Sequence, residues 1–143
     1  APRNSTFATF VASNSMTTTA NAAAGATNLM ITHASFDKDT KGTAKPGDIF
    51  TITDSSDSNH TKAYQVTRVE NEDDYLSGST PTIGATQLRV HFAPALQRTV
   101  SSGSTVVFND PKFRVVLKND IQEYDLNTDN LYDFSLKLEE AQP

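Results

Sequence analysis

The sequence contains no cysteine and no tryptophan. The absence of cysteine excludes disulfide bonds, thiolate nucleophiles and cysteine-ligated metal sites. A protein assembled in a reducing cytoplasm would show the same absence. The absence of tryptophan removes the usual stacking side chain of a carbohydrate-binding module, and only four tyrosines remain for that role.

Basic residues and long apolar runs are also scarce. The chain has 12 Lys and Arg against 17 Asp and Glu, which gives a formal net charge of −5. Binding along a phosphate backbone needs a basic stripe that releases counterions, so we expect no nucleic-acid partner. No run reaches the roughly 18 apolar residues of a membrane span, and the first four residues do not resemble a signal peptide. We therefore expect a soluble protein with no membrane partner.

The residues that are present are typical of one small β-rich domain. A length of 143 residues lies in the size range of a single compact unit. Hydrophobic residues make up 36% of the chain, with eight Phe and four Tyr to seed a core, which indicates a globular protein with a thin core. Ser, Thr, Asn and Asp are abundant, and their short polar side chains compete for the backbone and disfavour helices.

An internal repeat is the most informative local feature. The pattern Gly-Ala-Thr-x-Leu-x-(Ile/Val) occurs at residues 25–31 and again at 84–90, and a Gly-led apolar segment follows each copy, at 47–52 and 103–108. Apolar residues alternate with polar ones in these segments, which is the period of half-buried strands. We expect structurally matching strands within one sheet system, with a further strand around residues 64–69.

The first 21 residues are small and polar and predict an extended N-terminal arm. Phe7 and Phe10 are the aromatic side chains of this arm. They could anchor the arm to a neighbouring subunit or fold back onto the protein's own barrel. A short helix around residues 17–24 is a further alternative.

The last third of the chain predicts a long antiparallel hairpin. Apolar residues alternate over 112–118 and over 131–138, with turn residues at 127–130 between them, and a bulge is expected near 119–120. The alternation predicts one buried and one solvated face. The hairpin has an edge that must be covered, either by a neighbouring subunit or by the arm and the charges of Lys112, Arg114 and Lys118.

These patterns predict an all-β fold, a barrel or sandwich-like antiparallel domain with an extended N-terminal arm and a long C-terminal β-hairpin. The expected organisation is an arm at 1–21 and a single β domain at 22–143. Within that domain, residues 22–108 form the repeated-motif module and residues 112–140 form the hairpin.

No motif in the sequence predicts catalysis, a metal site or a cofactor. His33, His60 and His91 lack the close spacing of zinc ligands. The segment from Asp37 to Asp48 departs from a calcium loop at its ligand positions, and residues 54–60 are expected to form a solvated loop tip. No nucleophile-elbow pattern and no phosphate-binding glycine loop occur, so we expect a protein that is not an enzyme.

Four segments together resemble a small β module found in structural proteins of tailed bacteriophages. They are Ala-Gly-Ala-Thr-x-Leu-x-Ile at 24–31, Lys-Pro-Gly-Asp-Ile-Phe-Thr-Ile at 45–52, Tyr-Gln-Val-Thr at 64–67, and the Leu96…Val100…Gly103…Val106 element within 95–108. The resemblance covers residues 22–108, and it is shared by capsid, tail and baseplate components. Residues 113–140 look like the closing hairpin of small tail or baseplate proteins.

This resemblance implies a non-enzymatic structural subunit of a bacteriophage virion, assembled in the host cytoplasm. The favoured expectation is a tail or baseplate component that joins neighbouring subunits, with other phage structural proteins and copies of itself as partners. The alternatives are a head decoration or cement protein and a carbohydrate-binding module of a receptor-binding complex. The expected assembly contacts are aromatic and basic residues of the arm and hairpin: Phe7, Phe10, Lys112, Arg114, Tyr124, Tyr132 and Phe134.

Overall fold

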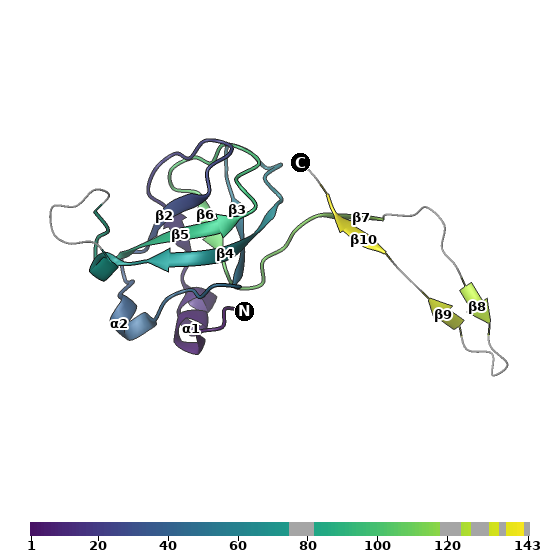
Figure 1. Ribbon diagram of the computed structural model, residues 1–143, viewed down its shortest axis with the longest axis horizontal. Helices are drawn as coiled ribbons and strands as arrows, with labels where there is room; N and C mark the ends of the chain where they lie inside the picture. The colour runs from purple at the N-terminus through teal and green to yellow at the C-terminus, as the bar shows by residue number, and fades with distance from the viewer. Residues whose placement is uncertain (75–81, 118–123, 127–131, 135–136, 142–143) are drawn as a thin grey trace.

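A computed structural model describes residues 1–74, 82–117, 124–126, 132–134 and 137–141 (Figure 1). Six strands form a closed antiparallel barrel in the order β1-β2-β5-β4-β3-β6, which confirms the predicted all-β fold. The barrel strands are β1 (Met16–Thr18), β2 (Asn28–Thr32), β3 (Ile49–Thr53), β4 (Ala63–Glu70), β5 (Gln87–Ala93) and β6 (Thr105–Val107). The helices are α1 (Ser5–Ser13), α2 (Lys38–Lys41) and the 3-10 turn η1 (Glu72–Asp74).

The two copies of each repeated motif lie side by side in the barrel. The Gly-Ala-Thr copies lead into β2 and β5, where Leu29 pairs with Val90 and Ile31 with Leu88. The two Gly-led segments contain β3 and β6, which are also neighbours in the barrel. The prediction of matching strands in one sheet is therefore correct, and the two copies of each motif pair with each other.

The barrel interior is filled by the alternate side chains of these strands. Phe50 is at its centre, with ring centroids 5.6 Å from Tyr64, 5.4 Å from Phe92 and 5.3 Å from Phe108. Offset and edge-to-face contacts of this kind stabilise aromatic pairs beyond the effect of area burial. The described aromatic side chains of residues 1–108 are thus concentrated in one core.

The N-terminal segment is a helix and a barrel strand, so the prediction of an extended arm is wrong. Asn4 caps α1, because its side chain accepts hydrogen bonds from the backbone N–H groups of Thr6 and Phe7. Phe7 and Phe10 are buried in the protein's own core, where the ring centroids of Phe7 and Phe108 lie 5.3 Å apart. β1 overlaps the start of residues 17–24, for which a short helix was the alternative, and it pairs with both β2 and β6.

Asp48 fixes the start of the chain to the barrel. Its two carboxylate oxygens accept hydrogen bonds from the backbone N–H groups of Arg3 and Lys45, each at 2.8 Å. Gly47 has φ +91°, and a Cβ at this position would lie 2.9 Å from Cζ of Arg3. Gly47 and Asp48, which precede β3, therefore receive the N-terminal segment.

A two-stranded ribbon leaves the barrel after β6 and projects away from it (Figure 1). At its base β7 (Val115–Leu117) pairs with β10 (Leu138–Glu140), and further out β8 (Tyr124–Leu126) pairs with β9 (Tyr132–Phe134). The described parts of residues 112–140 thus pair as an antiparallel hairpin. The expected turn at 127–130 and bulge at 119–120 lie outside the described residues.

The expected buried face of this hairpin is not buried at its base. Val115 and Leu117, which the alternation places on that face, are 41% and 47% exposed. Alternation shows that residues share a face, but the barrel is already closed and offers them no core. At the base of the ribbon, these apolar side chains are open to solvent.

Replacing Phe7 with alanine tests the structural role of α1. Phe7 is fully buried, so Phe7→Ala is expected to lower the free energy of unfolding by about 3–5 kcal/mol. The measurement is urea denaturation, with Thr6→Ala at the neighbouring exposed position as the control. An unchanged unfolding midpoint for Phe7→Ala would show that α1 is a dispensable arm after all.

Candidate functional site

The base of the ribbon gathers most of the exposed apolar side chains. Among the described residues, the exposed large hydrophobic side chains are Ile49 on the barrel and Phe113, Val115, Val116, Leu117 and Leu138 on the ribbon. Contiguous apolar patches on a protein surface mark sites of interaction more often than isolated apolar residues do. An isolated two-stranded hairpin is at best marginally stable in water. The ribbon is therefore the leading candidate for a binding surface.

The two faces of the ribbon differ in chemistry. Leu117 pairs with Leu138 in register, and side chains that are directly opposite each other share a face. Val115 lies on this same face because it is two residues from Leu117. We call Phe113, Val115, Leu117 and Leu138 the apolar face. The opposite face has the pair Val116 and Glu139.

Three cations lie on the opposite face of the ribbon, because each is one residue away from a member of the apolar face. Lys112, Arg114 and Lys137 are exposed, and none forms an ion pair with a carboxylate of the described residues. Lys112 and Arg114 were expected assembly contacts, and the structure leaves both accessible. Lys137 was not among the expected contacts. The sequence predicts one continuous strand over residues 131–138, whereas Lys137 lies between β9 and β10.

The other expected contacts have different positions. Phe7 and Phe10 are buried in the core and are not accessible to a neighbour. Tyr124 pairs in register with Phe134 in the outer part of the ribbon, and Tyr132 pairs with Leu126. These three aromatic residues thus belong to one two-stranded unit, as the hairpin prediction required.

Glu140 connects the ribbon to the barrel. One of its carboxylate oxygens accepts a hydrogen bond from the backbone N–H of Ala63 at 2.7 Å. The other oxygen forms an ion pair with Lys62, whose side chain is only 9% exposed. Without Glu140 the Lys62 ammonium would be a buried charge with no carboxylate partner, which is strongly unfavourable. This contact fixes the end of β10 beside the start of β4.

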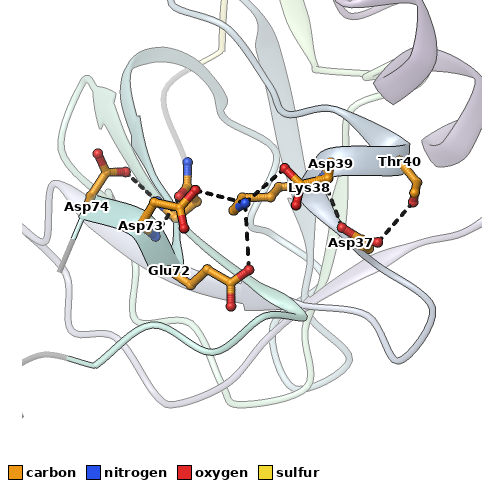
Figure 2. Close-up of polar contacts among 8 residues, drawn as sticks. Asp37, Lys38, Asp39, Thr40, Glu72, Asp73 and Asp74 are labelled. Atoms are coloured by element: carbon orange, nitrogen blue, oxygen red, sulfur yellow. Dashed lines mark hydrogen bonds and ion pairs between the residues drawn. The ribbon is translucent and has the colours of Figure 1, made fainter. Parts of the chain in front are cut away.

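Acidic side chains gather where α2 meets η1, as Figure 2 shows. The ammonium group of Lys38 lies 2.8 Å from Asp73, 2.9 Å from Asp39 and 3.7 Å from Glu72. Hydrogen bonds to Asp73 and then Asp39 raise the pKa of Lys38 above its ordinary value. Lys38 holds α2 against η1, and the carboxylates around it outnumber it.

The carboxylates at the two ends of the partial calcium-loop pattern have structural partners. Asp37 caps α2 by accepting a hydrogen bond from the backbone N–H of Asp39 at 2.9 Å. Asp48 receives the N-terminal segment, as described above. No group of three or more His, Cys, Asp or Glu among the described residues is arranged to hold a metal ion.

Residues 54–60 are solvated in the middle, as the sequence predicts, because Ser55, Ser56, Ser58 and Asn59 are exposed, but the two ends of the segment are buried. Asp54 is buried and accepts hydrogen bonds from the Ser56 hydroxyl at 2.6 Å and from the backbone N–H of Ser101 at 2.8 Å. The hydrogen bonds from Ser56 and Ser101 hold the pKa of Asp54 far below its usual range. The segment is thereby attached to the loop that precedes β6.

His60, at the other end of this segment, is also buried. Its Nε2 lies 2.8 Å from the hydroxyl of Tyr64, which in turn accepts a hydrogen bond from the backbone N–H of Gln97 at 3.3 Å. Burial lowers the pKa of His60 and raises that of Tyr64, so both side chains are neutral at pH 7. This pair has the character of a core contact.

His33 and His91 are in different surroundings. His91 lies on the outer side of β5, with Nε2 3.0 Å from the buried carboxylate of Glu70, which Arg68 also contacts. His33 accepts a hydrogen bond from the backbone N–H of Ser35 and packs against the ring of Phe10. The structure therefore does not bring these two histidines to one site.

A groove of about 470 Å³ lies between α1 and α2. Its lining is mostly hydroxyl-bearing: Ser5, Thr6, Thr9, Phe10, Ser13, Asn14, Thr40 and Lys41. The hydroxyl of Thr9 already donates to the Ser5 carbonyl, and that of Thr40 donates to Asp37. The lining contains neither a carboxylate nor an imidazole that could act as a general base.

Comparisons with known proteins add no assignment to this geometry. A scan against protein-family models finds no match, and a search of curated proteins finds none. No helix in the described part of the chain is both long enough and apolar enough to cross a membrane.

The low pKa of Asp54 predicts loss of stability in acid. An unfolded aspartate has a pKa near 3.9, so the contribution of Asp54 is complete above that value and is lost as the pH falls below it toward the folded pKa. We expect the free energy of unfolding of the wild-type protein to fall between pH 5 and pH 2 more steeply than that of Asp54→Asn. Urea denaturation across this range measures it, with Asp110→Asn at an exposed position as the control. Parallel curves for wild type and Asp54→Asn would contradict the assignment.

Proposed function

We propose that the protein is a non-enzymatic structural subunit of a bacteriophage virion, a tail or baseplate component that joins neighbouring subunits. The observation that carries the proposal is the ribbon, which exposes an apolar face beside a barrel that needs nothing from it to close. The resemblance of residues 22–108 to phage structural modules supplies the biological setting.

The strand edges support a role in assembly. Each of the six barrel strands is paired on both sides, whereas β7 and β10 each have one unpaired edge among the described strands. Unpaired edges are templates for pairing with another chain, and proteins that act alone cover or blunt them. Addition of a neighbour's strand to this edge is a common mode of recognition.

The free energy that the base of the ribbon can contribute favours a subunit held by several contacts over one held by a single contact. Burying a Val, Leu or Phe side chain fully contributes about 1.5–3 kcal/mol, so covering the four half-exposed side chains of the apolar face would contribute about 4 kcal/mol. Association of two proteins costs an estimated 4–15 kcal/mol in lost freedom. The base of the ribbon alone would give weak binding, which suits a subunit that is held by several neighbours in a symmetric assembly.

The buried titratable groups support a structural role over catalysis. Asp48 and Asp54 accept hydrogen bonds that join distant parts of the chain, and Glu140 joins the ribbon to the barrel. His60 is paired with Tyr64 inside the core. These groups already serve the fold, which agrees with a protein whose function is its contacts.

Particle composition tests this proposal. Mass spectrometry of purified virions is expected to give about six or twelve copies per particle, the stoichiometry of a ring around a tail axis. Labelling with an antibody to this chain should mark the tail in electron micrographs. Hundreds of copies on the head would contradict the tail assignment and favour head decoration, and absence from particles would contradict a virion role.

Complementation of a phage that lacks this chain tests the ribbon itself. Leu117→Asp is expected to reduce incorporation into particles at least about tenfold, because it places a charge on the apolar face. Thr67→Asp adds the same charge at an exposed position of β4 and should be incorporated normally. Equal incorporation of both variants would show that the apolar face is not a contact.

A further inference from the structure

The outer edge of β10, on the side away from β7, presents backbone groups that could pair with another strand. Among the described strands, β10 pairs only with β7 (Figure 1). The backbone N–H of Ala141 donates to the Arg114 carbonyl at 2.8 Å, and hydrogen-bonded and non-hydrogen-bonded pairs alternate along an antiparallel ladder. Leu138, which pairs with Leu117, is therefore in a non-hydrogen-bonded pair. Its own N–H and C=O point away from β7, toward the outer edge.

The side chains along this edge are complementary to themselves in charge. Lys137 and Glu139 lie on one face of the ribbon, and Leu138 lies between them on the apolar face. All three side chains are exposed. In an antiparallel pair of two β10 strands centred on Leu138, Lys137 of each copy lies directly opposite Glu139 of the other. Opposite charges in this position stabilise a strand pair. Contacts that Glu139 makes within its own chain leave acceptor positions open, because a carboxylate has about four.

We propose that the outer edge of β10 pairs with the same edge of a second copy, antiparallel and centred on Leu138. The two ribbons then form one four-stranded sheet in the order β7-β10-β10-β7. This inference rests on the proposed function, since it names a second copy of the chain as one of the neighbouring subunits. Both copies use the same surface, so the contact is isologous and closes at a dimer. Main-chain hydrogen bonds supply the attraction, as in other cases of strand addition.

The same register joins the apolar faces of the two copies. Leu117 lies opposite Leu138 within each chain, and Leu138 of one copy lies opposite Leu138 of the other. One face of the four-stranded sheet therefore has a row of four leucines. These side chains are 47% and 53% exposed in the single chain, and neighbours in the row cover part of that surface. A sheet of three or more strands with an apolar face is also more stable than an isolated two-stranded hairpin.

The outer edge of β7 does not have this complementarity. On the face opposite the apolar one, β7 has Val116, and Arg114 and Lys112 precede it at intervals of two residues. None of these three residues is a carboxylate. A pair formed by two β7 strands would therefore place cations of both copies along adjoining strands with no carboxylate between them, which opposes that pairing.

The attachment of Glu140 to the barrel holds the edge of β10 in place. Its carboxylate accepts a hydrogen bond from the backbone N–H of Ala63 at 2.7 Å and forms an ion pair with Lys62. The end of β10 is thus fixed before a second copy binds. Such preorganisation reduces the entropy that association must remove.

Disulfide trapping tests the register directly, because the chain has no cysteine. Leu138→Cys is expected to form a covalent dimer under mild oxidation, since the Cα atoms of a hydrogen-bonded pair lie about 5.5 Å apart, within the range of a disulfide. Leu117→Cys is the matched control, because it lies on the same face with similar exposure but one strand further from the contact. Its dimer should form at least about tenfold more slowly. Equal rates, or faster trapping of Leu117→Cys, would overturn the proposal.

Charge complementation supplies a second readout. Lys137→Glu and Glu139→Lys each place like charges opposite each other in a homodimer, so each variant alone is expected to self-associate about tenfold more weakly in sedimentation analysis. A mixture of the two variants should associate as well as the wild type, because opposite charges then face each other at both positions. Lys112→Glu, on the same face but outside the contact, should leave self-association unchanged. Failure of the mixture to associate, in chains whose thermal unfolding is unchanged, would contradict pairing of the β10 edges.

The outcomes separate this inference from the proposed function. If the chain is present in virions but Leu138→Cys is trapped no faster than Leu117→Cys, the virion role stands and the β10 contact is wrong. If Leu138→Cys is trapped selectively but virions lack the chain, the contact stands and the virion role is wrong.

Discussion

Closure of the barrel by β1 is the constraint on which the rest of the structure depends. This three-residue strand pairs with β2 on one side and β6 on the other, so without it both neighbours would have free edges. The segment before it is held by local chemistry. Asn4 caps α1, Asp48 receives the backbone of Arg3, and Phe7 fills the core from α1.

A barrel closed in this way has no place for the C-terminal residues. The chain leaves β6 with its core complete, and the apolar side chains that follow have no interior to enter. Glu140 attaches the ribbon through a carboxylate contact to Lys62 and Ala63 without burying the apolar face. The surface of this protein that most needs a partner is thus a direct consequence of how its N-terminus completes the barrel.

The strands were predictable because their signal is local. Alternating apolar residues and the repeated Gly-Ala-Thr motif mark β2, β3, β5 and β6 without any knowledge of tertiary contacts. α1 also had a local signal. Asn4 precedes Phe7, Phe10 and Val11, a spacing of three and four that fits one helix face. The abundance of Ser, Thr and Asn across the whole chain outweighed this short pattern, although composition is an average and a nine-residue helix hardly changes it.

The polar clusters and the exposed face were not predictable from local patterns. Asp54 meets Ser101 and Glu140 meets Lys62 across dozens of residues, and no spacing rule in a single sequence brings such groups together. The alternation in the ribbon predicted the strand pairing correctly but the burial wrongly. A period of two shows which residues share a face, but it does not show what covers that face. The bulge at Val66/Arg68 shows the same limit, since it places Glu70 on the outer side of β4, beside Arg89 of β5.

Hydrogen exchange of the isolated chain and of the chain within particles tests the central claim most directly, namely that the barrel is complete without the ribbon. The account predicts that amides of β1 exchange as slowly as those of β2 and β5, and that those of β7 and β10 exchange rapidly in the isolated chain. Within particles, the amides of β7 and β10 should become protected. Rapid exchange of β1 alone, or a ribbon as protected as the barrel in the isolated chain, would contradict the account.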